Sequence, residues 1–193
     1  MNYCSVCGNP VTLAIPQGDD RERHICNHCD TIHYQNPRII TGCLVTHDKQ
    51  ILLCKRAIEP RKHFWTLPAG FMENGETTEE GAIRETWEEA KATVKSEGLY
   101  QIFNLPHINQ VYFFYRASFL NPQSSTPLFA AGPESLEVEL FSPENLPWDQ
   151  LAFPVIKQTL LDYLGDREQG HFPVRDQKIN INALLQQNTN AQN

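Results

Sequence analysis

Apolar residues recur along this chain at two spacings, one typical of strands and one typical of helices. β-Branched and apolar residues dominate Ile39–Thr46, and a second such run, Ile51–Cys54, follows four polar residues, which together predict two antiparallel strands. Shorter or alternating runs predict further strands at Phe64–Leu67, Val111–Phe119 and Leu136–Phe141.

Two other segments have their apolar residues at helical spacing. The first follows Thr77, where Thr77 and Glu80 have the three-residue spacing of a capping box, and it should reach about Ala92. The second is Phe153–Leu164. Strands interleaved with helices predict the α/β class.

Polarity divides the chain into three zones. Residues 1–33 are polar and rich in cysteine, residues 34–165 carry the apolar segments of a folded domain, and residues 166–193 turn polar again. Within this last zone Gln186–Asn193 contains only Gln, Asn, Thr and Ala, which bury too little apolar surface to offset the entropy of ordering. We therefore expect a small N-terminal domain, a main domain and a C-terminal extension that is partly disordered.

Composition and charge narrow the classes of function. Among 193 residues, 40% are hydrophobic, which supports a packed core, and no apolar run approaches the roughly 20 residues of a membrane span. The first residues lack a basic and apolar leader, so we expect a cytoplasmic protein. A formal charge of −7 argues against broad nucleic-acid binding, but it permits an anionic small molecule if bound cations invert the local field.

The first predicted helix concentrates carboxylates on one side. An apolar face consists of Ala82, Ile83, Thr86, Trp87 and Ala90. A roughly opposite face carries Glu85, Glu88 and Glu89, where like charges repel and the helix dipole is unfavourable towards the C-terminus. A bound cation would remove this cost, and hard oxygen ligands select Mg²⁺ or Mn²⁺, although a solvated acidic face is the ordinary alternative.

The segment before this helix fits the same interpretation. Gly70 and Gly75 permit a tight loop from which a backbone carbonyl could join the metal ligands. Glu76 and Arg84 can pair across the junction of loop and helix and so orient the two segments, although a surface ion pair of little energy is the alternative.

The pattern Gly70-x5-Glu76-x7-Arg84-Glu85-x2-Glu88-Glu89 resembles the Nudix box of the Nudix hydrolases. Two positions depart from it: Thr86 replaces an aliphatic residue, and Lys91 replaces a glycine, so the helix end should be extended or strained. The resemblance implies an α/β/α sandwich with a mixed sheet, and water attack on a diphosphate with Mg²⁺ neutralising phosphate oxygens. It also implies that Glu85, Glu88 and Glu89, with Gly70, bind Mg²⁺ or act as the base.

An acidic segment downstream resembles one that often supplies a further ligand or base in this family. It leads into the strand that ends at Phe141, and its candidates are Glu134 and Glu137. Solvated loop carboxylates are the alternative.

Four of the six cysteines form two Cys-x-x-Cys pairs, Cys4/Cys7 and Cys26/Cys29, separated by 18 residues. This spacing is typical of a zinc ribbon with tetrahedral Cys₄ coordination, and the closed ligand shell indicates structural Zn²⁺. An iron–sulfur site and redox-active thiols are the alternatives. Cys43 and Cys54 lie in apolar strands and are expected to be buried free thiols.

The wider sequence resembles the zinc-ribbon Nudix enzymes of bacteria and plant plastids described as ADP-ribose and FAD pyrophosphatases. Segments that carry this resemblance include Trp65–Gly70 and Phe103–Asn109. It implies release of AMP from a nucleoside diphosphate linked to another group. Pocket candidates from the residues alone are two basic side chains for phosphate and two aromatic side chains for stacking, namely Arg56, Arg61, Trp65 and Tyr112.

Two other functions stay open. A zinc ribbon before a Nudix box is also found in NADH diphosphatases, so NAD(H) or NAD-capped RNA is an alternative substrate, although the Ser-Gln-Pro…Pro-Phe-Pro segment of that group is absent here. An alternative of another class is a regulator in which the ribbon binds nucleic acid and the Nudix fold senses a ligand. The ribbon could also form a homodimer interface.

Overall fold

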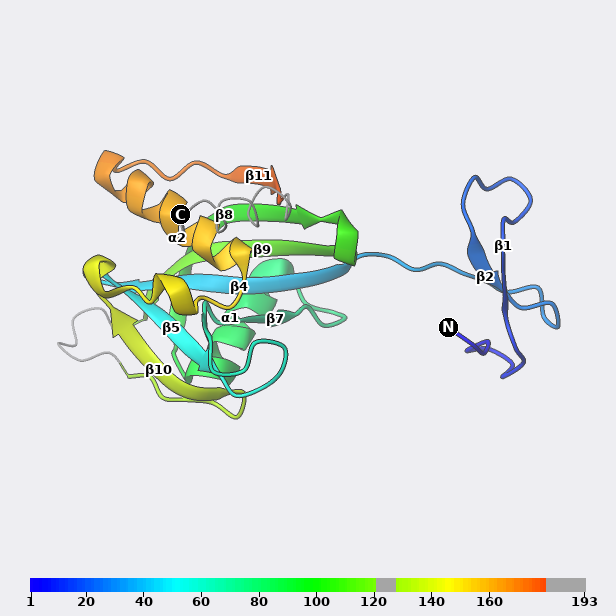
Figure 1. Ribbon diagram of the computed structural model, residues 1–193, viewed down its shortest axis with the longest axis horizontal. Helices are drawn as coiled ribbons and strands as arrows, with labels where there is room; N and C mark the ends of the chain where they lie inside the picture. The colour runs from blue at the N-terminus through cyan, green and yellow to red at the C-terminus, as the bar shows by residue number, and fades with distance from the viewer. Residues whose placement is uncertain (121–127, 180–193) are drawn as a thin grey trace, which may run out of the picture. The chain divides into compact units, whose positions relative to one another are not determined.

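The computed structural model describes residues 1–120 and 128–179, which fall into two compact units, Met1–Pro37 and Arg38–Asn193 (Figure 1). The first division lies at Pro37, four residues beyond the boundary expected from polarity. The expected boundary at residue 165 falls inside a helix, and that helix and a following strand belong to the second unit. The polar segment Gln186–Asn193 lies outside the described residues.

The first unit is a small antiparallel sheet with almost no apolar interior. Its strands are β1 (Thr12–Ala14), β2 (Arg23–Ile25) and β3 (Ile32–His33). Only Cys4, Pro16 and Cys26 are buried in this unit. A unit of this size with so little buried surface needs a further source of stability.

The second unit is built on a mixed eight-stranded sheet with the order β10-β5-β4-β9-β8-β11, in which β6 also pairs with β5 and β7 with β4. The pairs β4–β9 and β11–β8 are parallel, and the others are antiparallel. The strands are β4 (Arg38–His47), β5 (Gln50–Arg56), β6 (Trp65–Thr66), β7 (Ala69–Phe71), β8 (Val94–Leu105), β9 (Gln110–Phe119), β10 (Ser135–Phe141) and β11 (Arg175–Lys178). Two α-helices and three short 3₁₀ helices complete the unit: α1 (Thr78–Ala90), α2 (Pro154–Gln169), η1 (Pro106–Ile108), η2 (Pro143–Asn145) and η3 (Trp148–Gln150).

The two helices cover opposite faces of this sheet (Figure 1). Successive strand residues point to opposite faces, so Cys43 and Val45 of β4 pack with Ala82 and Ala90 of α1, whereas Leu44 packs on the face of α2. The α/β/α arrangement with a mixed sheet expected from the sequence is confirmed. No helix in residues 1–120 and 128–179 has the length and apolar character needed to cross a membrane.

Helix α1 begins where its capping pattern predicts. The Thr77 hydroxyl accepts the backbone N–H of Glu80 at 3.2 Å, and the Glu80 carboxylate accepts the backbone N–H of Thr77 at 2.8 Å. The helix ends at Ala90 instead of Ala92, because Lys91 takes the left-handed conformation with φ 50°. Lys91 thus occupies a conformation that favours glycine, and the helix is not extended.

The division of α1 into an apolar face and a solvated acidic face needs correction. Trp87 is 50% exposed and lies outside the core, with the Lys91 ammonium 5.4 Å from its ring centroid. Glu89, in contrast, is only 5% exposed. The sheet covers a sector of the helix centred on Ala82, Thr86 and Ala90, and this sector takes in Glu89 instead of Trp87.

Candidate active site

Arg84 joins the loop before α1 to the carboxylates of the helix. Its guanidinium donates to Glu76 with distances of 2.8 and 3.0 Å, to Glu85 at 2.7 Å and to Glu88 at 3.1 Å. A further N–H donates to the carbonyl of Phe71 at 3.0 Å. These hydrogen bonds from Arg84 lower the pKa of Glu76 to about 2. The planar, multidentate donor therefore fixes both the loop and two acidic side chains.

Strand β7 lies directly over the acidic side chains. Residues 69–71 pair with β4, and this pairing fixes the backbone of Gly70 opposite Thr41. The backbone N–H of Ala69 donates to a carboxylate oxygen of Glu89 at 3.2 Å. A Cβ built on Gly70 would lie 2.3 Å from Oε2 of Glu85, so this position has room for glycine alone.

Glu85 and Glu89 are acidic groups held where charge is unfavourable. Burial raises the pKa of Glu89 to about 8, and burial also raises the pKa of Glu85. Each carboxylate also adds to the repulsion felt by the nearby acidic groups, including Glu134. A cation bound among these oxygens would relieve both costs.

These carboxylates fit a hydrated divalent cation better than a tightly enclosed one. Within the described part of the chain, only the four cysteines bring ligand atoms to within 4.8 Å of one another. Arg84 holds Glu85 and Glu88, and like charges repel, so the oxygens stay apart. Mg²⁺ keeps several waters and binds through few protein carboxylates, which suits such a donor set.

Glu134 reaches the same site through a close contact with the end of α1. The backbone N–H of Gly132 donates to the carbonyl of Glu89 at 2.9 Å, and that of Ala130 donates to the carbonyl of Ala90 at 2.8 Å. A Cβ on Gly132 would lie 1.7 Å from the carbonyl oxygen of Glu88, so only glycine allows this approach. Sequence analysis did not single out Gly132, and only its place before Glu134 hints at a role.

The structure separates the two downstream candidates. Glu134 lines a cavity together with Glu85, Glu88 and Glu89. Glu137 lies on β10, outside this cavity, and accepts a hydrogen bond from the Lys55 ammonium at 3.0 Å.

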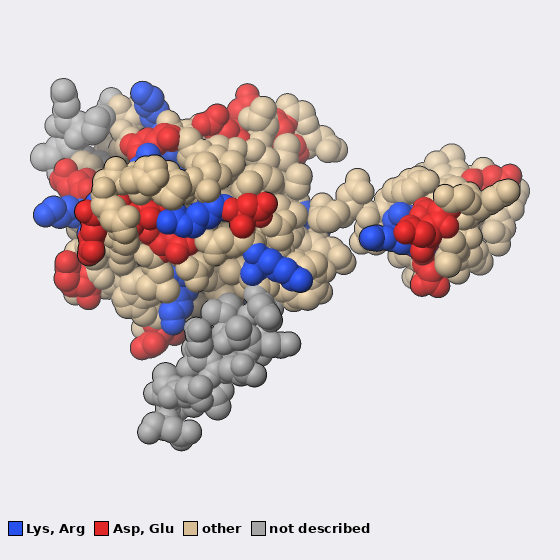
Figure 2. All heavy atoms as spheres, turned by 90° about the horizontal axis from the view of Figure 1, so that it is seen from above, with Lys and Arg blue, Asp and Glu red and all other residues tan. Residues whose placement is uncertain are grey.

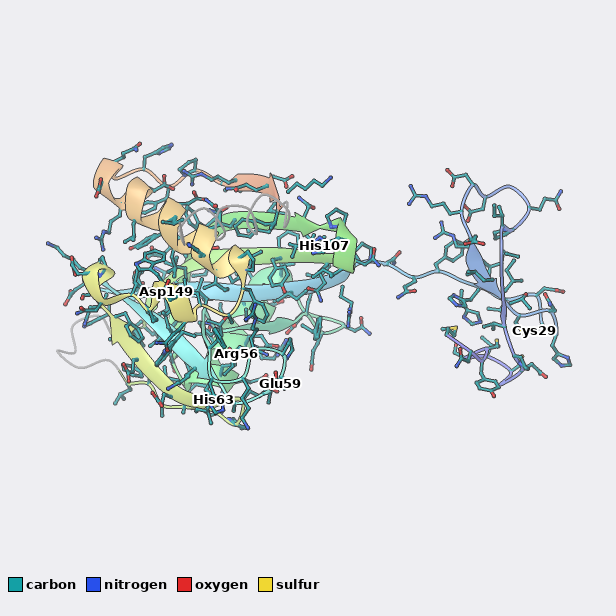
Figure 3. The ribbon with its side chains drawn as sticks, viewed as in Figure 1. Cys29, Arg56, Glu59, His63, His107 and Asp149 are labelled. Carbon is teal, nitrogen blue, oxygen red and sulfur yellow. The ribbon has the colours of Figure 1, made fainter. Side chains whose placement is uncertain are left out.

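The cavity has a volume of about 840 Å³, within the range of about 300–1,000 Å³ that holds small ligands. One part is acidic and contains the carboxylates already described. Another part is apolar and includes Leu105, Ile108, Phe153, Ile156 and Ile179. Figure 3 labels three polar residues that also line it: Arg56 and Glu59 on the segment after β5, and His107 between β8 and β9.

Two of the four predicted substrate-binding side chains line this cavity, namely Arg56 and Tyr112. The Arg56 guanidinium donates to the Pro60 carbonyl at 2.9 Å, and it lies 5.2 Å from the ring centroid of Phe153. Trp65 does not reach the cavity, because it is 5% exposed and packs edge-on against Phe141 in the core. Arg61 is exposed elsewhere, where its guanidinium lies over the ring of Phe64.

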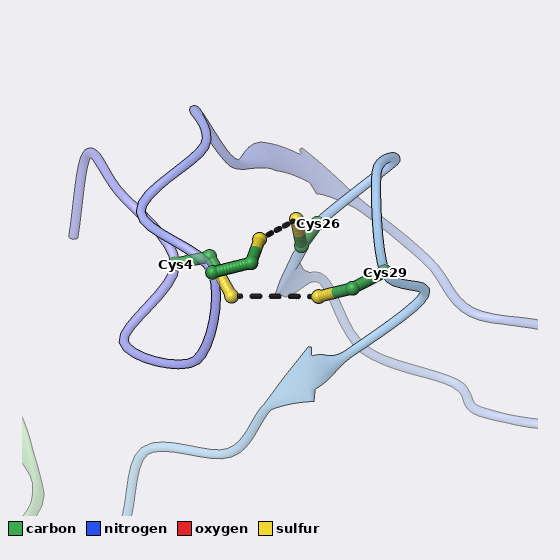
Figure 4. Close-up of side chains that lie close together, drawn as sticks. Cys4, Cys26 and Cys29 are labelled. Atoms are coloured by element: carbon green, nitrogen blue, oxygen red, sulfur yellow. Dashed lines mark hydrogen bonds between the residues drawn. The ribbon is translucent and has the colours of Figure 1, made fainter.

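The N-terminal unit gathers its four cysteines into one cluster. Figure 4 shows the contacts between Cys4 and Cys29, at 3.7 Å, and between the sulfurs of Cys7 and Cys26, at 3.4 Å. Tetrahedral zinc with Zn–S bonds of about 2.3 Å requires sulfurs about 3.8 Å apart. The cluster is therefore consistent with the Cys₄ set of a zinc ribbon.

Burial and hydrogen bonding at this cluster fit a bound cation. Hydrogen bonds from Asn9 lower the pKa of Cys7 to about 6, whereas burial raises the pKa of Cys26 to about 11. His33 Nε2 lies 3.3 Å from the sulfur of Cys4. Two of the three buried residues of this unit are cysteines of the cluster, so a metal here would take the place of an apolar core.

Comparisons with known proteins agree with this division of the chain. A family model described as Nudix N-terminal matches residues 2–35, and the model of the NUDIX domain matches residues 36–163. A solved NUDIX hydrolase from Nitrosomonas europaea is 48% identical with a TM-score of 0.85, covering 93% of this chain and 100% of that chain.

Two kinds of curated relative match over long segments. An ADP-ribose pyrophosphatase of Methanocaldococcus jannaschii is 33% identical over 120 residues, which are 62% of this chain and 69% of that protein. An NAD-capped RNA hydrolase NudC of Vibrio vulnificus is 31% identical over 176 residues, 86% of this chain and 62% of that protein. The chain thus spans less than two thirds of the length of that NudC relative.

Proposed function

Because this chain belongs to the NUDIX family of hydrolases, we propose that it cleaves the diphosphate of an ADP-ribose-type nucleotide and releases AMP, with FAD as a larger substrate of the same type. The observation that carries this proposal is the single cavity in which the carboxylates of α1 meet an apolar wall. A nucleoside diphosphate has the same two parts, an anionic diphosphate and an aromatic base. The similarity to an ADP-ribose pyrophosphatase supports this choice of substrate.

The acidic part of the cavity is the proposed reaction centre. Glu85, Glu88 and Glu89, with the carbonyl of Gly70, are the proposed ligands of a divalent cation, Mg²⁺ or Mn²⁺. Such a cation, when bound, supplies positive charge that neutralises the diphosphate oxygens. Arg84 is proposed to orient Glu85 and Glu88 for this role, since it donates to both carboxylates.

Glu134 is the proposed acceptor of a proton from the attacking water. It lines the cavity with the helix carboxylates, whereas Glu137 is engaged with Lys55 on the edge of β10. The segment that carries Glu134 is held by backbone hydrogen bonds to the last carbonyls of α1, which supports a fixed position for this carboxylate. A positioned base contributes typically 10²–10⁴-fold to a rate, as an order of magnitude.

Arg56 is the proposed phosphate contact. Its guanidinium lines the cavity and is fixed by the Pro60 carbonyl and the ring of Phe153. A planar, permanently charged donor group suits a phosphate oxygen pair. Arg84 is less suited to this role because its donors are engaged by protein oxygens.

NAD-capped RNA is the second candidate substrate, favoured by the match to a NudC relative that extends across both units. The formal charge of −7 favours a small nucleotide over a long polyanion. On the face shown in Figure 2, basic side chains stand in small groups among acidic ones, without forming a continuous basic surface. A regulator that lacks hydrolysis is set aside because the chain is a NUDIX hydrolase.

The four cysteines of the N-terminal unit are proposed to hold one structural zinc ion. The cytoplasmic location expected from the sequence stays a prediction.

A panel of ADP-ribose, FAD, NADH and NAD-capped RNA, assayed with Mg²⁺ for released AMP or mononucleotide, tests the function. We expect the highest kcat/KM for ADP-ribose or FAD, and losses of at least about 100-fold in Glu88→Gln and Glu89→Gln. Glu79→Gln is the matched control, because Glu79 is exposed on the first turn of the same helix and does not line the cavity. Wild-type turnover in both site variants, or preference for capped RNA, would contradict the proposal.

A further inference from the structure

The apolar part of the cavity is completed by a residue that lies beyond the matched NUDIX domain. The family match ends at residue 163, whereas β11 comprises Arg175–Lys178 and is followed by Ile179. Ile179 lines the cavity and is 8% exposed. Its backbone N–H donates to the carbonyl of Asn104 at 3.3 Å, which continues the pairing of β11 with β8.

Polar side chains hold β11 at both ends. At the start, Arg175 forms a two-pronged ion pair with Asp166 of α2, with N–O distances of 2.5 and 2.6 Å. Towards the end, Asp176 accepts a hydrogen bond from the side chain of Asn104 at 2.5 Å, and Gln177 donates to Asp162 at 3.0 Å.

These contacts make Ile179 a fixed part of the wall. A parallel edge strand of four residues has few hydrogen bonds of its own, so the side-chain contacts decide its register. This register brings Ile179 into the core cluster that also contains Leu105 and Ile156. All three side chains line the cavity.

The chemistry of this wall selects a flat, weakly polar group. The aliphatic side chains offer apolar contact, and the nearby rings of Tyr112 and Phe153 can pack against an aromatic plane. The carboxylates lie in the acidic part of the same cavity, where the proposed function places the diphosphate. A substrate group that occupies the apolar part is therefore attached to that diphosphate and uncharged.

We propose that Ile179, carried by β11, forms the wall against which the nucleobase of the substrate packs, so that the C-terminal strand sets the size of the base accepted. This inference rests on the proposed function for the identity of the ring as the base of an adenine nucleotide. Ile179 is then a specificity-determining residue that is distant from the reacting bond.

The two products of ADP-ribose cleavage separate base recognition from phosphate recognition. AMP carries the base and ribose 5-phosphate does not, so calorimetric titration of the full-length protein with each compound isolates the wall. In Ile179→Ala we expect AMP to bind about 10-fold more weakly, since removing one methylene from an apolar pocket costs about 10- to 200-fold. Ribose 5-phosphate should bind within about 2-fold of wild type.

Val174→Ala is the matched control, because Val174 lies just before β11, is 56% exposed and does not line the cavity. Ile179→Val keeps the branched shape and serves if the alanine variant fails to fold, with an expected loss of AMP affinity of about 3-fold. Folding is checked by the melting temperature.

A change of substrate size gives a second readout that a purely structural role would not move. Ile179→Phe adds volume to the wall and should lower kcat/KM for ADP-ribose bearing an enlarged etheno-adenine base more than for ADP-ribose itself, by about 10-fold. Equal losses for the two substrates, or AMP affinity that is unchanged in folded Ile179→Ala and Ile179→Val, would overturn the inference. Failure of the wild-type protein to cleave any nucleoside diphosphate contradicts the proposed function instead, because the AMP titration does not need turnover.

Discussion

Gly70 and Glu85 are so close that a Cβ on Gly70 would lie 2.3 Å from Oε2 of the Glu85 carboxylate. The pairing of β7 with β4 holds Gly70 from one side, and the hydrogen bond from Arg84 holds Glu85 from the other. Neither partner can move far without breaking these contacts. The absence of a side chain at residue 70 is thus a geometric requirement of the acidic site.

Gly70→Ala is expected to lower kcat by at least about 100-fold, because a displacement of about 1 Å at a reaction centre has an effect of this size. The measurement is steady-state hydrolysis of ADP-ribose. Gly165→Ala is the control, since Gly165 lies within α2 and a Cβ there meets nothing within 4 Å. It should retain activity and gain about 0.5–1 kcal/mol in the free energy of unfolding. Full activity of Gly70→Ala would remove the steric argument.

Arg84→Lys is expected to lower kcat by about 10- to 100-fold although the positive charge is kept. An ammonium cannot reproduce the fork that contacts Glu76, Glu85 and Glu88 together. The comparison of kcat and KM in the variant checks this, with Arg167→Lys as control because Arg167 makes a single hydrogen bond, to the carbonyl of Lys49. If Arg84→Lys behaves like its control, charge alone accounts for the role of Arg84.

Gly132→Ala is expected to lower kcat by about 10-fold or more, because its Cβ would overlap the carbonyl oxygen of Glu88 and displace the segment that carries Glu134. The free energy of unfolding should fall by about 1–3 kcal/mol, as in other overpacked positions. Enzyme kinetics and urea unfolding of one preparation give both quantities. A variant with reduced stability and unchanged kcat would show that Gly132 does not position Glu134.

Elemental analysis of the full-length protein is expected to find about one zinc per chain, and Cys26→Ser should lose it. Residues Met1–Pro37 should then become sensitive to protease, because this unit has only three buried residues and two are cysteines of the cluster. Cys54→Ala is the control, since Cys54 is buried in the other unit. Iron in place of zinc, or zinc retained in Cys26→Ser, would contradict the assignment.

Asp166→Asn is expected to lower the free energy of unfolding at pH 7 by about 3 kcal/mol, because it leaves the Arg175 guanidinium without its buried partner. The hydrogen bonds from Arg175 hold the pKa of Asp166 below its ordinary value. The pair therefore contributes its full stability above the unfolded pKa of about 3.9, and this contribution is lost as the pH falls through the folded value.

Urea unfolding of wild type and Asp166→Asn across the pH range checks this dependence. The difference between the two proteins should be constant from about pH 5 to 7 and shrink below about pH 4. Glu168→Gln, a neutralised and exposed acid on the same helix, should show no such difference. A gap that persists unchanged at pH 3 would argue against ionic pairing at Asp166.

Local patterns in the sequence determined the elements whose own residues specify them. The apolar runs of β4, β5 and β9, the capping box of α1 and the helical spacing of α2 each depend on residues close together in the chain. The same is true of the glutamates on α1 and the paired cysteines, whose spacing sets their juxtaposition on one helix or in one metal loop. Short-range stereochemistry is readable from short-range sequence.

Elements stabilised by distant partners were not predicted. Strand β8 contains Gly98 and several charged residues, and it is a strand because it pairs with β9 over most of its length. Strand β11 has no apolar alternation, and it is held by polar contacts to α2 and β8. Such pairing energies arise only once the partners meet.

Tertiary structure alone decided which side chains share the cavity. Glu134 lies in it and Glu137 does not, although both belong to one acidic segment. Trp65 is buried in the core instead of facing substrate, while Ile179 reaches the cavity from the far end of the described chain. The sequence by itself determined the type of chemistry, through residue identity and local spacing. The shape of the substrate wall depended on contacts between residues far apart in the chain, which no local pattern encodes.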